Sequence, residues 1–136
     1  MDNKVPAALF VGRFQPPHLG HSWLFEQKLN KGIPILIAIR DIEPDNKNPL
    51  YAKEVQKLWK KIYKNQNVEV IIITDIESVN YGRGVGYEIN EHVPPVDICN
   101  ISATQIRNSI KNGSDDWKMM VNEKIHDDII ELLSKD

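Results

Sequence analysis

The chain has 136 residues, of which 41 % are hydrophobic, 26 % charged and 7 % aromatic. This length and composition predict one globular domain over residues 1–136 and exclude the disordered class. The formal net charge of −2 argues against a nucleic-acid partner. A lone cysteine, Cys99, and the lack of a signal peptide or membrane span predict a cytoplasmic protein without an internal disulfide or a membrane partner.

The first elements are a strand, a turn rich in cations and histidines, and a helix. The apolar run 7–11 predicts a buried strand, and residues 22–29 predict a helix. Between them lie Arg13, His18 and His21, with two prolines. Helix N-termini at such junctions point their N–H groups at anions, so we expect a phosphate site here.

The middle of the chain predicts two more strands around an amphipathic helix. Residues 33–39 and 68–74 are continuous apolar runs, which are typical of parallel strands covered by helices. Asn48 and Pro49 predict the start of the helix between them, as N-cap and first helical residue. Its apolar stripe consists of Val55, Leu58, Trp59, Ile62 and Tyr63.

The last third predicts a fourth strand and two helices. Residues 88–92 suggest a short helix, residues 96–101 a strand, and Ser102 the N-cap of a helix that ends near Gly113. Ile125, Ile129, Ile130, Leu132 and Leu133 predict the apolar side of a closing helix. The order indicates an α/β fold: a single-domain, Rossmann-like open parallel sheet with helices on both faces.

Two strand-to-helix junctions therefore fall at the carboxyl edge of the predicted sheet, where such folds bind ligands. The first supplies Arg13, His18 and His21, and the second supplies hydroxyls and a further cation: Ser102, Thr104 and Arg107. Cations, imidazoles and N–H donors without a carboxylate pair suit phosphate-centred chemistry.

Plainer interpretations of the same residues remain open. The two histidines could bond carbonyls in a tight turn, and Ser102 could serve only as a helix cap. Arg107 could instead pair with Asp97 or Glu91. The glycine-rich segment 82–86 could form turns, or bring backbone N–H groups to a base or an acceptor.

Both junctions also carry a family resemblance. Residues 12–21, Gly-Arg-Phe-Gln-Pro-Pro-His-Leu-Gly-His, look like the N-terminal signature of the HxGH nucleotidyltransferase (cytidylyltransferase-like) superfamily. Residues 101–107, Ile-Ser-Ala-Thr-Gln-Ile-Arg, resemble its second signature, ISSTxIR. The wording of the first motif is most similar to archaeal-type nicotinamide mononucleotide adenylyltransferases. Residues 48–55 are similar to the NPFTAGER segment of that branch, but Val55 stands where the family has an arginine that contacts phosphate or acceptor.

The resemblance implies transfer of a nucleoside monophosphate from a nucleoside triphosphate to a phosphorylated small-molecule acceptor, with release of pyrophosphate. Mg²⁺ would be bound mainly through the substrate phosphates. ATP with nicotinamide mononucleotide or a similar acceptor is the favoured pair. The first alternative is CTP with a phosphorylated alcohol or sugar. The second alternative is that the chain is a non-catalytic nucleotide-binding module. Relatives often form homo-oligomers, so we expect one here.

The resemblance also assigns residues to roles. The catalytic set is His18, His21, Arg13 and Arg107. The nucleotide and phosphate contacts are Gly12, Phe14, Gln15, Gly20, Ser102, Ala103 and Thr104. Possible acceptor or base contacts are Arg40, Asp41, Lys53, Gly82 and Arg83, and no protein metal ligand is expected.

Overall fold

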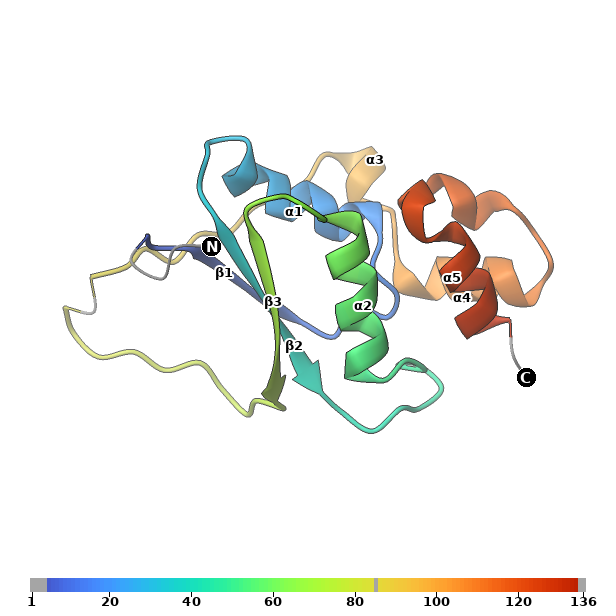
Figure 1. The fold of residues 1–136 in the computed structure, drawn as a ribbon, viewed down its shortest axis with the longest axis horizontal. Helices are drawn as coiled ribbons and strands as arrows, with labels where there is room; N and C mark the ends of the chain where they lie inside the picture. Colours follow the sequence, from blue (N-terminus) through green and yellow to red (C-terminus); the bar gives the residue numbers. More distant parts are fainter. Residues whose placement is uncertain (1–4, 85, 135–136) are drawn as a thin grey trace.

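The centre of the structure, a computed structural model that describes residues 5–84 and 86–134, is a parallel sheet (Figure 1). Its strands β1 (Ala8–Gly12), β2 (Ile35–Asp41) and β3 (Val68–Thr74) pair in the order β1-β2-β3. The register places Phe10 beside Ile37, and Ile37 beside Val70. The three predicted apolar runs thus form the open parallel sheet of a Rossmann-like α/β fold, as expected from the sequence.

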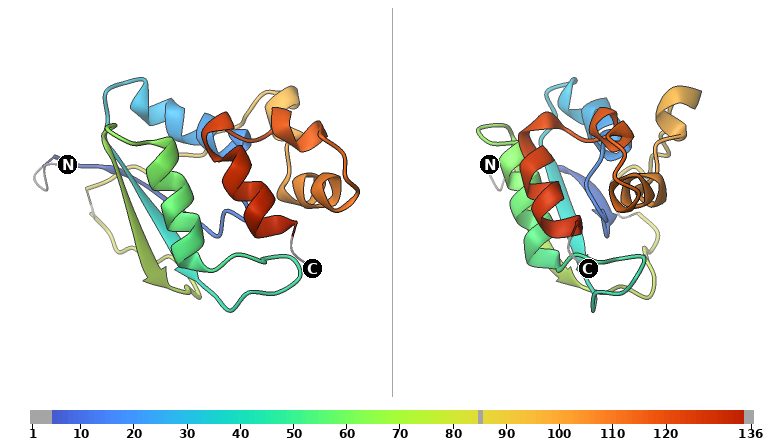
Figure 2. Two further views of the ribbon diagram at one scale, coloured as in Figure 1. Left: turned by 45° about the vertical axis from the view of Figure 1, so that its right-hand side comes forward. Right: turned by 90° about the vertical axis from the view of Figure 1, so that its right-hand side faces the viewer.

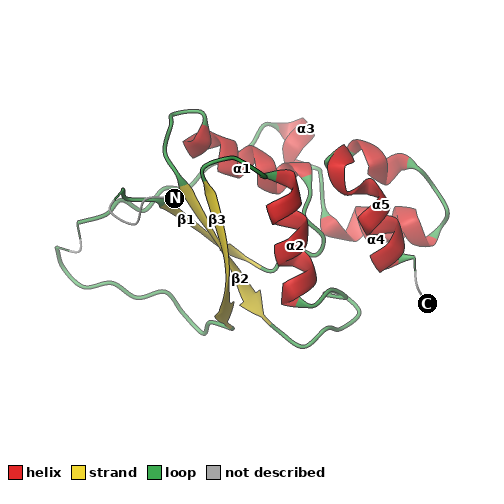
Figure 3. Ribbon diagram, in the orientation of Figure 1, coloured by secondary structure: helices red, strands yellow, loops and turns green. Residues whose placement is uncertain are grey.

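The helices alternate with the strands and then follow one another at the C-terminal end (Figure 3). They are α1 (Leu19–Leu29), α2 (Ala52–Ile62), α3 (Val96–Cys99), α4 (Ala103–Lys111) and α5 (His126–Leu133), with 3₁₀ helices η1 (Asp116–Met119) and η2 (Glu123–Ile125). Ser102 caps α4, because its hydroxyl accepts the Gln105 N–H at 3.1 Å. Asn112 ends that helix and Gly113 follows with a φ of 74°, as predicted.

Helices α1 and α2 pack side by side on one face of the sheet. The Phe25 ring of α1 lies 4.9 Å from that of Phe10 in β1 and 5.0 Å from that of Trp59 in α2, between centroids. Both crossovers step in the same direction across the sheet, and right-handed crossovers then place their helices on one side. On the other face Leu9 is 60 % exposed and Val11 37 %. Helices were expected on both faces, and these two share one.

The apolar stripe predicted for α2 is the centre of the core. Its members Val55, Leu58, Trp59, Ile62 and Tyr63 are all buried. Trp59 is fully buried against Phe25 and against Phe14 from the first junction, with the two phenylalanine rings at 5.0 and 5.5 Å. The core therefore reaches from the sheet to the turn that carries the histidines.

Helix α2 begins later than the predicted start at Asn48 and Pro49. Both the N–H and the C=O of Leu50 are hydrogen-bonded to the side chain of Gln15, which holds this residue outside the helix. The helix begins at Ala52, where the Tyr51 N–H donates to the Glu54 carboxylate at 2.9 Å. A distant side chain, 35 residues earlier in the sequence, thus sets this boundary.

Two elements predicted in the last third are wrong. Residues 88–92 form no helix, and Ile89 is 67 % exposed, because so short a segment with no buried side is unstable as a helix. Residues 96–101 form no strand. The first four residues are α3, closed by the Cys99 N–H donating to the Pro95 carbonyl at 2.8 Å. Proline fixes a helix-compatible φ at this start, −59° for Pro95.

The segment from β3 to α3 is consequently a long loop. Residues 75–84 and 86–95 contain no helix or strand, and the loop runs away from the helices before it returns to α3 (Figures 1 and 2). Cys99 is exposed in α3 rather than buried in a sheet. Over the described ranges, no helix has the length and apolar character needed to cross a membrane.

Replacing Trp59 should test how far stability depends on this core. Trp59→Ala should lower the free energy of unfolding by about 3–5 kcal/mol, because it removes a fully buried ring from the contact between α1, α2 and the turn. Trp59→Phe should cost less, since the indole Nε1 is buried with no hydrogen-bonding partner in the described chain. Urea unfolding midpoints measure both variants, and an alanine variant within 1 kcal/mol of the parent would contradict the packing argument.

Candidate active site

The turn after β1 is shaped by the ring of Phe14. This residue has a φ of 51°, in the left-handed region, and is only 7 % exposed. Its ring folds back over Gly12, where a Cβ would lie 2.8 Å from the Phe14 Cζ. Gly12 is therefore needed for the close approach of this ring. The Phe14 side chain belongs to the core, so any contact from it to a nucleotide would come from its backbone.

The two histidines of the turn lie stacked at the start of α1. Their ring centroids are 3.7 Å apart and their planes are 18° from parallel. The His18 ring folds over the helix N-terminus, where a Cβ on Gly20 would come within 2.8 Å of the His18 Cε1. Gly20 therefore leaves room for the imidazole that caps the helix.

Backbone N–H groups fix the protonation of both rings. The Gly20 N–H donates to Nδ1 of His18 at 3.0 Å, and the His18 N–H donates to Nδ1 of His21 at 3.1 Å. A nitrogen that accepts a hydrogen bond carries no proton, so each neutral ring holds its proton on Nε2. The pair therefore offers two Nε2–H donors.

Burial keeps these rings neutral. It lowers the pKa of His18 to about 4. Burial, and then the charge of His18, holds the pKa of His21 well below its usual value. At neutral pH neither ring carries a positive charge, so the pair can donate hydrogen bonds but cannot serve as a cationic acid.

Gln15 joins the first junction to the loop before α2. Its amide Nε2 donates to the Leu50 carbonyl at 3.0 Å, and its Oε1 accepts the Leu50 N–H at 2.8 Å. Gln15 is 5 % exposed and Leu50 1 %, so the pair is buried. The two bonds commit the amide to the protein, and contact from Gln15 to a nucleotide would also come from its backbone.

The second junction is held against the first by Arg107. Its Nη1 donates to the backbone carbonyl of Gln15 at 2.8 Å, and its Nη2 donates to the Thr104 hydroxyl at 3.4 Å. This guanidinium therefore bonds neither Asp97 nor Glu91. Through it, the N-terminus of α4, with Ser102, Ala103 and Thr104, lies beside the turn that carries the histidines. The two predicted motifs meet.

The strand ends add further charges to this edge. Arg40, at the end of β2, donates from Nε to Asp75 at 2.6 Å and from Nη2 to the Ile76 carbonyl at 3.3 Å. Hydrogen bonds from Asn48 are the main cause that lowers the pKa of Asp45, and the charge of Arg13 adds to them. Arg13 itself has a buried Nε with no hydrogen-bonding partner among the described residues.

A cleft lies between the end of β2, strand β3 and the first turn of α2. It has a volume of about 620 Å³, and its lining includes the predicted contacts Asp41 and Lys53 together with Tyr51 and Glu54. Tyr51 is 61 % exposed, an aromatic side chain available for stacking. The sequence analysis missed it, although an aromatic residue directly before the first turn of α2 was a usable signal.

Gly82 and Arg83 are not brought to this edge. Both are exposed in the long loop after β3, and no described atom lies within 4 Å of a Cβ built on Gly82. That loop extends away from α4 in Figure 1 and in the left view of Figure 2. Within residues 5–84 and 86–134, no three histidine, cysteine, aspartate or glutamate side chains gather as metal ligands would.

The fold and this edge define a class of protein. A parallel α/β sheet presents, at its carboxyl edge, a helix N-terminus, guanidinium groups and neutral imidazole donors, which are groups that bind phosphates. The sequence model of the cytidylyltransferase-like family matches residues 9–122. The chain belongs to the cytidylyltransferase-like family, as the two motifs indicated.

Curated proteins show the same relationship at low identity. The chain is 23 % identical over 109 residues to a nicotinamide-nucleotide adenylyltransferase of Caldivirga maquilingensis. This match covers 77 % of the chain and 61 % of that protein. It is 35 % identical over 57 residues to a nicotinamide/nicotinic acid mononucleotide adenylyltransferase of Acinetobacter baylyi. That match covers 40 % of this chain and 30 % of the relative. Each match thus spans less than two thirds of the relative.

The buried histidines predict acid sensitivity. An unfolded His18 should titrate near 6.5 but the folded one near 4, so the unfolded state binds more protons between these values. Stability should therefore fall by roughly 3 kcal/mol as the pH drops through this window, and more with His21. Urea midpoints against pH and ¹⁵N imidazole shifts measure this. Titration of His18 near 6.5, or a proton on its Nδ1 at neutral pH, would contradict the assigned structure.

Proposed function

We propose that this chain is an adenylyltransferase that transfers AMP from ATP to nicotinamide mononucleotide or a similar phosphorylated acceptor and releases pyrophosphate. The observation that carries this proposal is the pair of Nε2–H donors at the N-terminus of α1, beside the N-terminus of α4. The names of the similar curated proteins point to the same substrates.

The transfer needs no group on the enzyme to form a covalent bond. An oxygen of the acceptor phosphate attacks the α-phosphorus of ATP in line, and the bond from that phosphorus to the bridging oxygen breaks. The electron pair of the broken bond leaves with pyrophosphate. Negative charge grows on the phosphate oxygens during this step, and preformed donors that face those oxygens lower the barrier.

His18 and His21 suit that task as neutral donors. The two backbone hydrogen bonds hold their Nε2–H groups in place before substrate binds, so little reorganisation is needed. Arg13 has an Nε without a partner in the described chain and would bind a phosphate oxygen. The free N–H groups of α4, with the Ser102 and Thr104 hydroxyls, would hold the β- and γ-phosphates.

We expect magnesium at this edge only when it is bound to the substrate phosphates. Mg²⁺ prefers oxygen anions, but the carboxylates at this edge, Asp45 and Asp75, are engaged by Asn48 and Arg40. Among the described residues they form no group of three metal-ligating side chains. Mg²⁺ would accordingly arrive with the triphosphate and would offset its negative charge. The residues of this chain would contribute hydrogen bonds and positive charge around that complex.

One observation departs from the adenylyltransferase motif and therefore favours the second acceptor, a phosphorylated alcohol or sugar. Val55, in the position of the family arginine, is fully buried in the core and cannot bind a phosphate. Arg40 is engaged by Asp75, whereas Lys53 is exposed in the lining of the cleft and forms none of the ion pairs found in the described chain. Lys53 would then bind the acceptor phosphate, and CTP with a phosphorylated alcohol or sugar becomes the second candidate pair.

A substrate matrix tests the proposal. ATP, CTP, GTP and UTP are each combined with nicotinamide mononucleotide, glycerol phosphate and sugar phosphates in the presence of Mg²⁺, and pyrophosphate release is measured. We expect turnover with ATP and the mononucleotide. Turnover only with CTP and a polyol phosphate would replace the adenylyl assignment, and no release with any pair would favour a non-catalytic nucleotide-binding module.

Substitution of His21 tests the role of the donors. His21→Ala should lower kcat about 10²–10³-fold, the usual effect of removing one donor to a developing oxyanion, with a smaller change in KM. His92→Ala is the matched control, because His92 stacks on Phe10 at 6.5 Å in the long loop, and its activity should stay near that of the parent. A folded His21→Ala variant with near-parent kcat would contradict the assigned role.

A further inference from the structure

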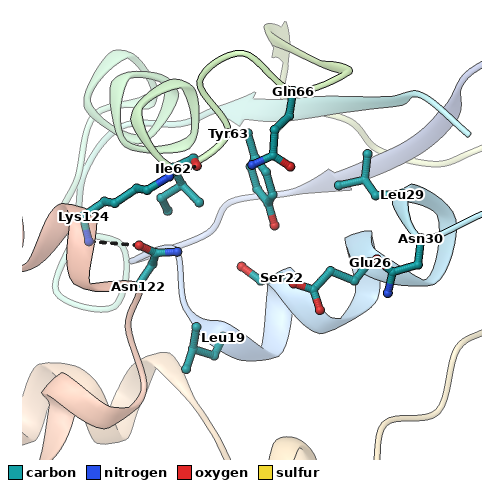
Figure 4. Close-up of a pocket in the computed structure, with 10 residues that line it drawn as sticks. All are labelled: Leu19, Ser22, Glu26, Leu29, Asn30, Ile62, Tyr63, Gln66, Asn122 and Lys124. Atoms are coloured by element: carbon teal, nitrogen blue, oxygen red, sulfur yellow. Dashed lines mark hydrogen bonds between the residues drawn. The ribbon is translucent and has the colours of Figure 1, made fainter. Parts of the chain in front are cut away.

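A second cleft lies on the helix layer, between α1, the end of α2 and the segment before α5 (Figure 4). Its volume is about 220 Å³. None of Arg13, His18, His21 and Arg107 lines it. The cleft is smaller than the roughly 300–1,000 Å³ of sites for drug-sized molecules, so its occupant must be about the size of an amino acid.

The floor of this cleft holds two facing hydroxyls, those of Tyr63 and Ser22. Tyr63 is 7 % exposed, and its hydroxyl is buried at the floor of the cleft. It points toward the hydroxyl of Ser22, which is also 7 % exposed (Figure 4). Burial raises the pKa of Tyr63 to about 12, so the group remains a neutral donor. A ligand oxygen that accepted a hydrogen bond from this group would add to its contact with Ser22.

Opposite charges flank these hydroxyls. Lys124 and the amide of Asn122 lie on one side, and Glu26 lies on the other (Figure 4). None of the ion pairs among the described residues uses Lys124 or Glu26. The Lys124 ammonium makes only a long hydrogen bond of 3.4 Å, to the Ile62 carbonyl. Both charged groups are therefore available to a ligand.

We propose that this cleft binds a small zwitterion, with its carboxylate against Lys124, Asn122 and the Tyr63 hydroxyl and its ammonium against Glu26. A ligand with one charge would leave the opposite group of the cleft unpaired, and a neutral one would leave both. The inference does not depend on the proposed transferase activity, because none of the catalytic residues proposed above takes part.

The position of the cleft gives the ligand a connection to the catalytic helix. The N–H of Leu19, at the start of α1, donates to the carbonyl of Met120 at 2.8 Å. The segment 120–124 is thereby tied to the helix end that carries the histidines. A zwitterion that bridges Lys124 and Glu26 would hold the same two segments together, so binding should shift the amide resonance of Leu19.

Titration of the ¹⁵N-labelled protein with ω-amino acids of increasing length tests the proposal. Glycine, 4-aminobutyrate and 6-aminohexanoate are the probes, and butyrate and butylamine are the single-charge controls. We expect saturable shifts at the cleft residues for at least one ω-amino acid, with a Kd of about 1 mM as befits so small a ligand. Either control should bind at least tenfold more weakly. Equal binding of butyrate or butylamine, or no saturable binding by any probe, would overturn the proposal.

Single substitutions then locate the binding. Tyr63→Phe should weaken it about fivefold, because the substitution removes one hydrogen-bond donor to the ligand carboxylate. Glu26→Gln and Lys124→Gln should each weaken it about tenfold. Glu131→Gln and Lys111→Gln, at exposed positions outside the lining, are the matched controls and should bind as the parent does. Binding that survives unchanged in Tyr63→Phe and Glu26→Gln contradicts this site, whatever the transferase assays give.

Discussion

The site depends on one residue, Gln15, that bonds two distant parts of the chain. Its amide bonds both backbone groups of Leu50, and its own carbonyl accepts the guanidinium of Arg107. Gln15 therefore connects the turn with the histidines, the loop before α2 and the start of α4. The first two bonds are buried, where unpaired amide groups are costly, so none of the segments can move alone without breaking a hydrogen bond.

The hydrogen bonding of backbone N–H groups also explains the placement of the two histidines and of the glycines beside them. At the start of a helix the first N–H groups lack helical partners, and here two imidazole nitrogens accept hydrogen bonds from the Gly20 and His18 N–H groups. The bonds fix the tautomer of each ring, and the close approach of the rings leaves no room for a Cβ at Gly20. The glycines at positions 12 and 20 are thus explained by aromatic packing, before any phosphate is considered.

Periodicity and cap chemistry predicted most of the fold, because these signals are local. The three strands are continuous apolar runs, the stripe of α2 is core, and Ser102 caps α4 as its sequence suggested. The failures have different causes, one local and one distant. Residues 96–101 have a strand-like pattern but Pro95 starts a helical turn, and the bonds from Gln15 to Leu50 delay α2. Both motifs could be found in the sequence, whereas their junction through Arg107 and the tautomers of the histidines could not.

The buried position of Val55 bears on how an acceptor could be held. An arginine at this position would place its charge in the core between α2 and the sheet, where desolvation costs several kcal/mol unless the charge is paired. The first turn of α2 offers the phosphate another cation, Lys53, which is exposed two residues earlier and lines the cleft with Tyr51. A lysine is a flexible point charge rather than a bidentate fork, so it fixes the orientation of a phosphate less strictly. Selectivity for the acceptor would then depend on the part of the acceptor that is attached to its phosphate and on how that part packs against the ring of Tyr51.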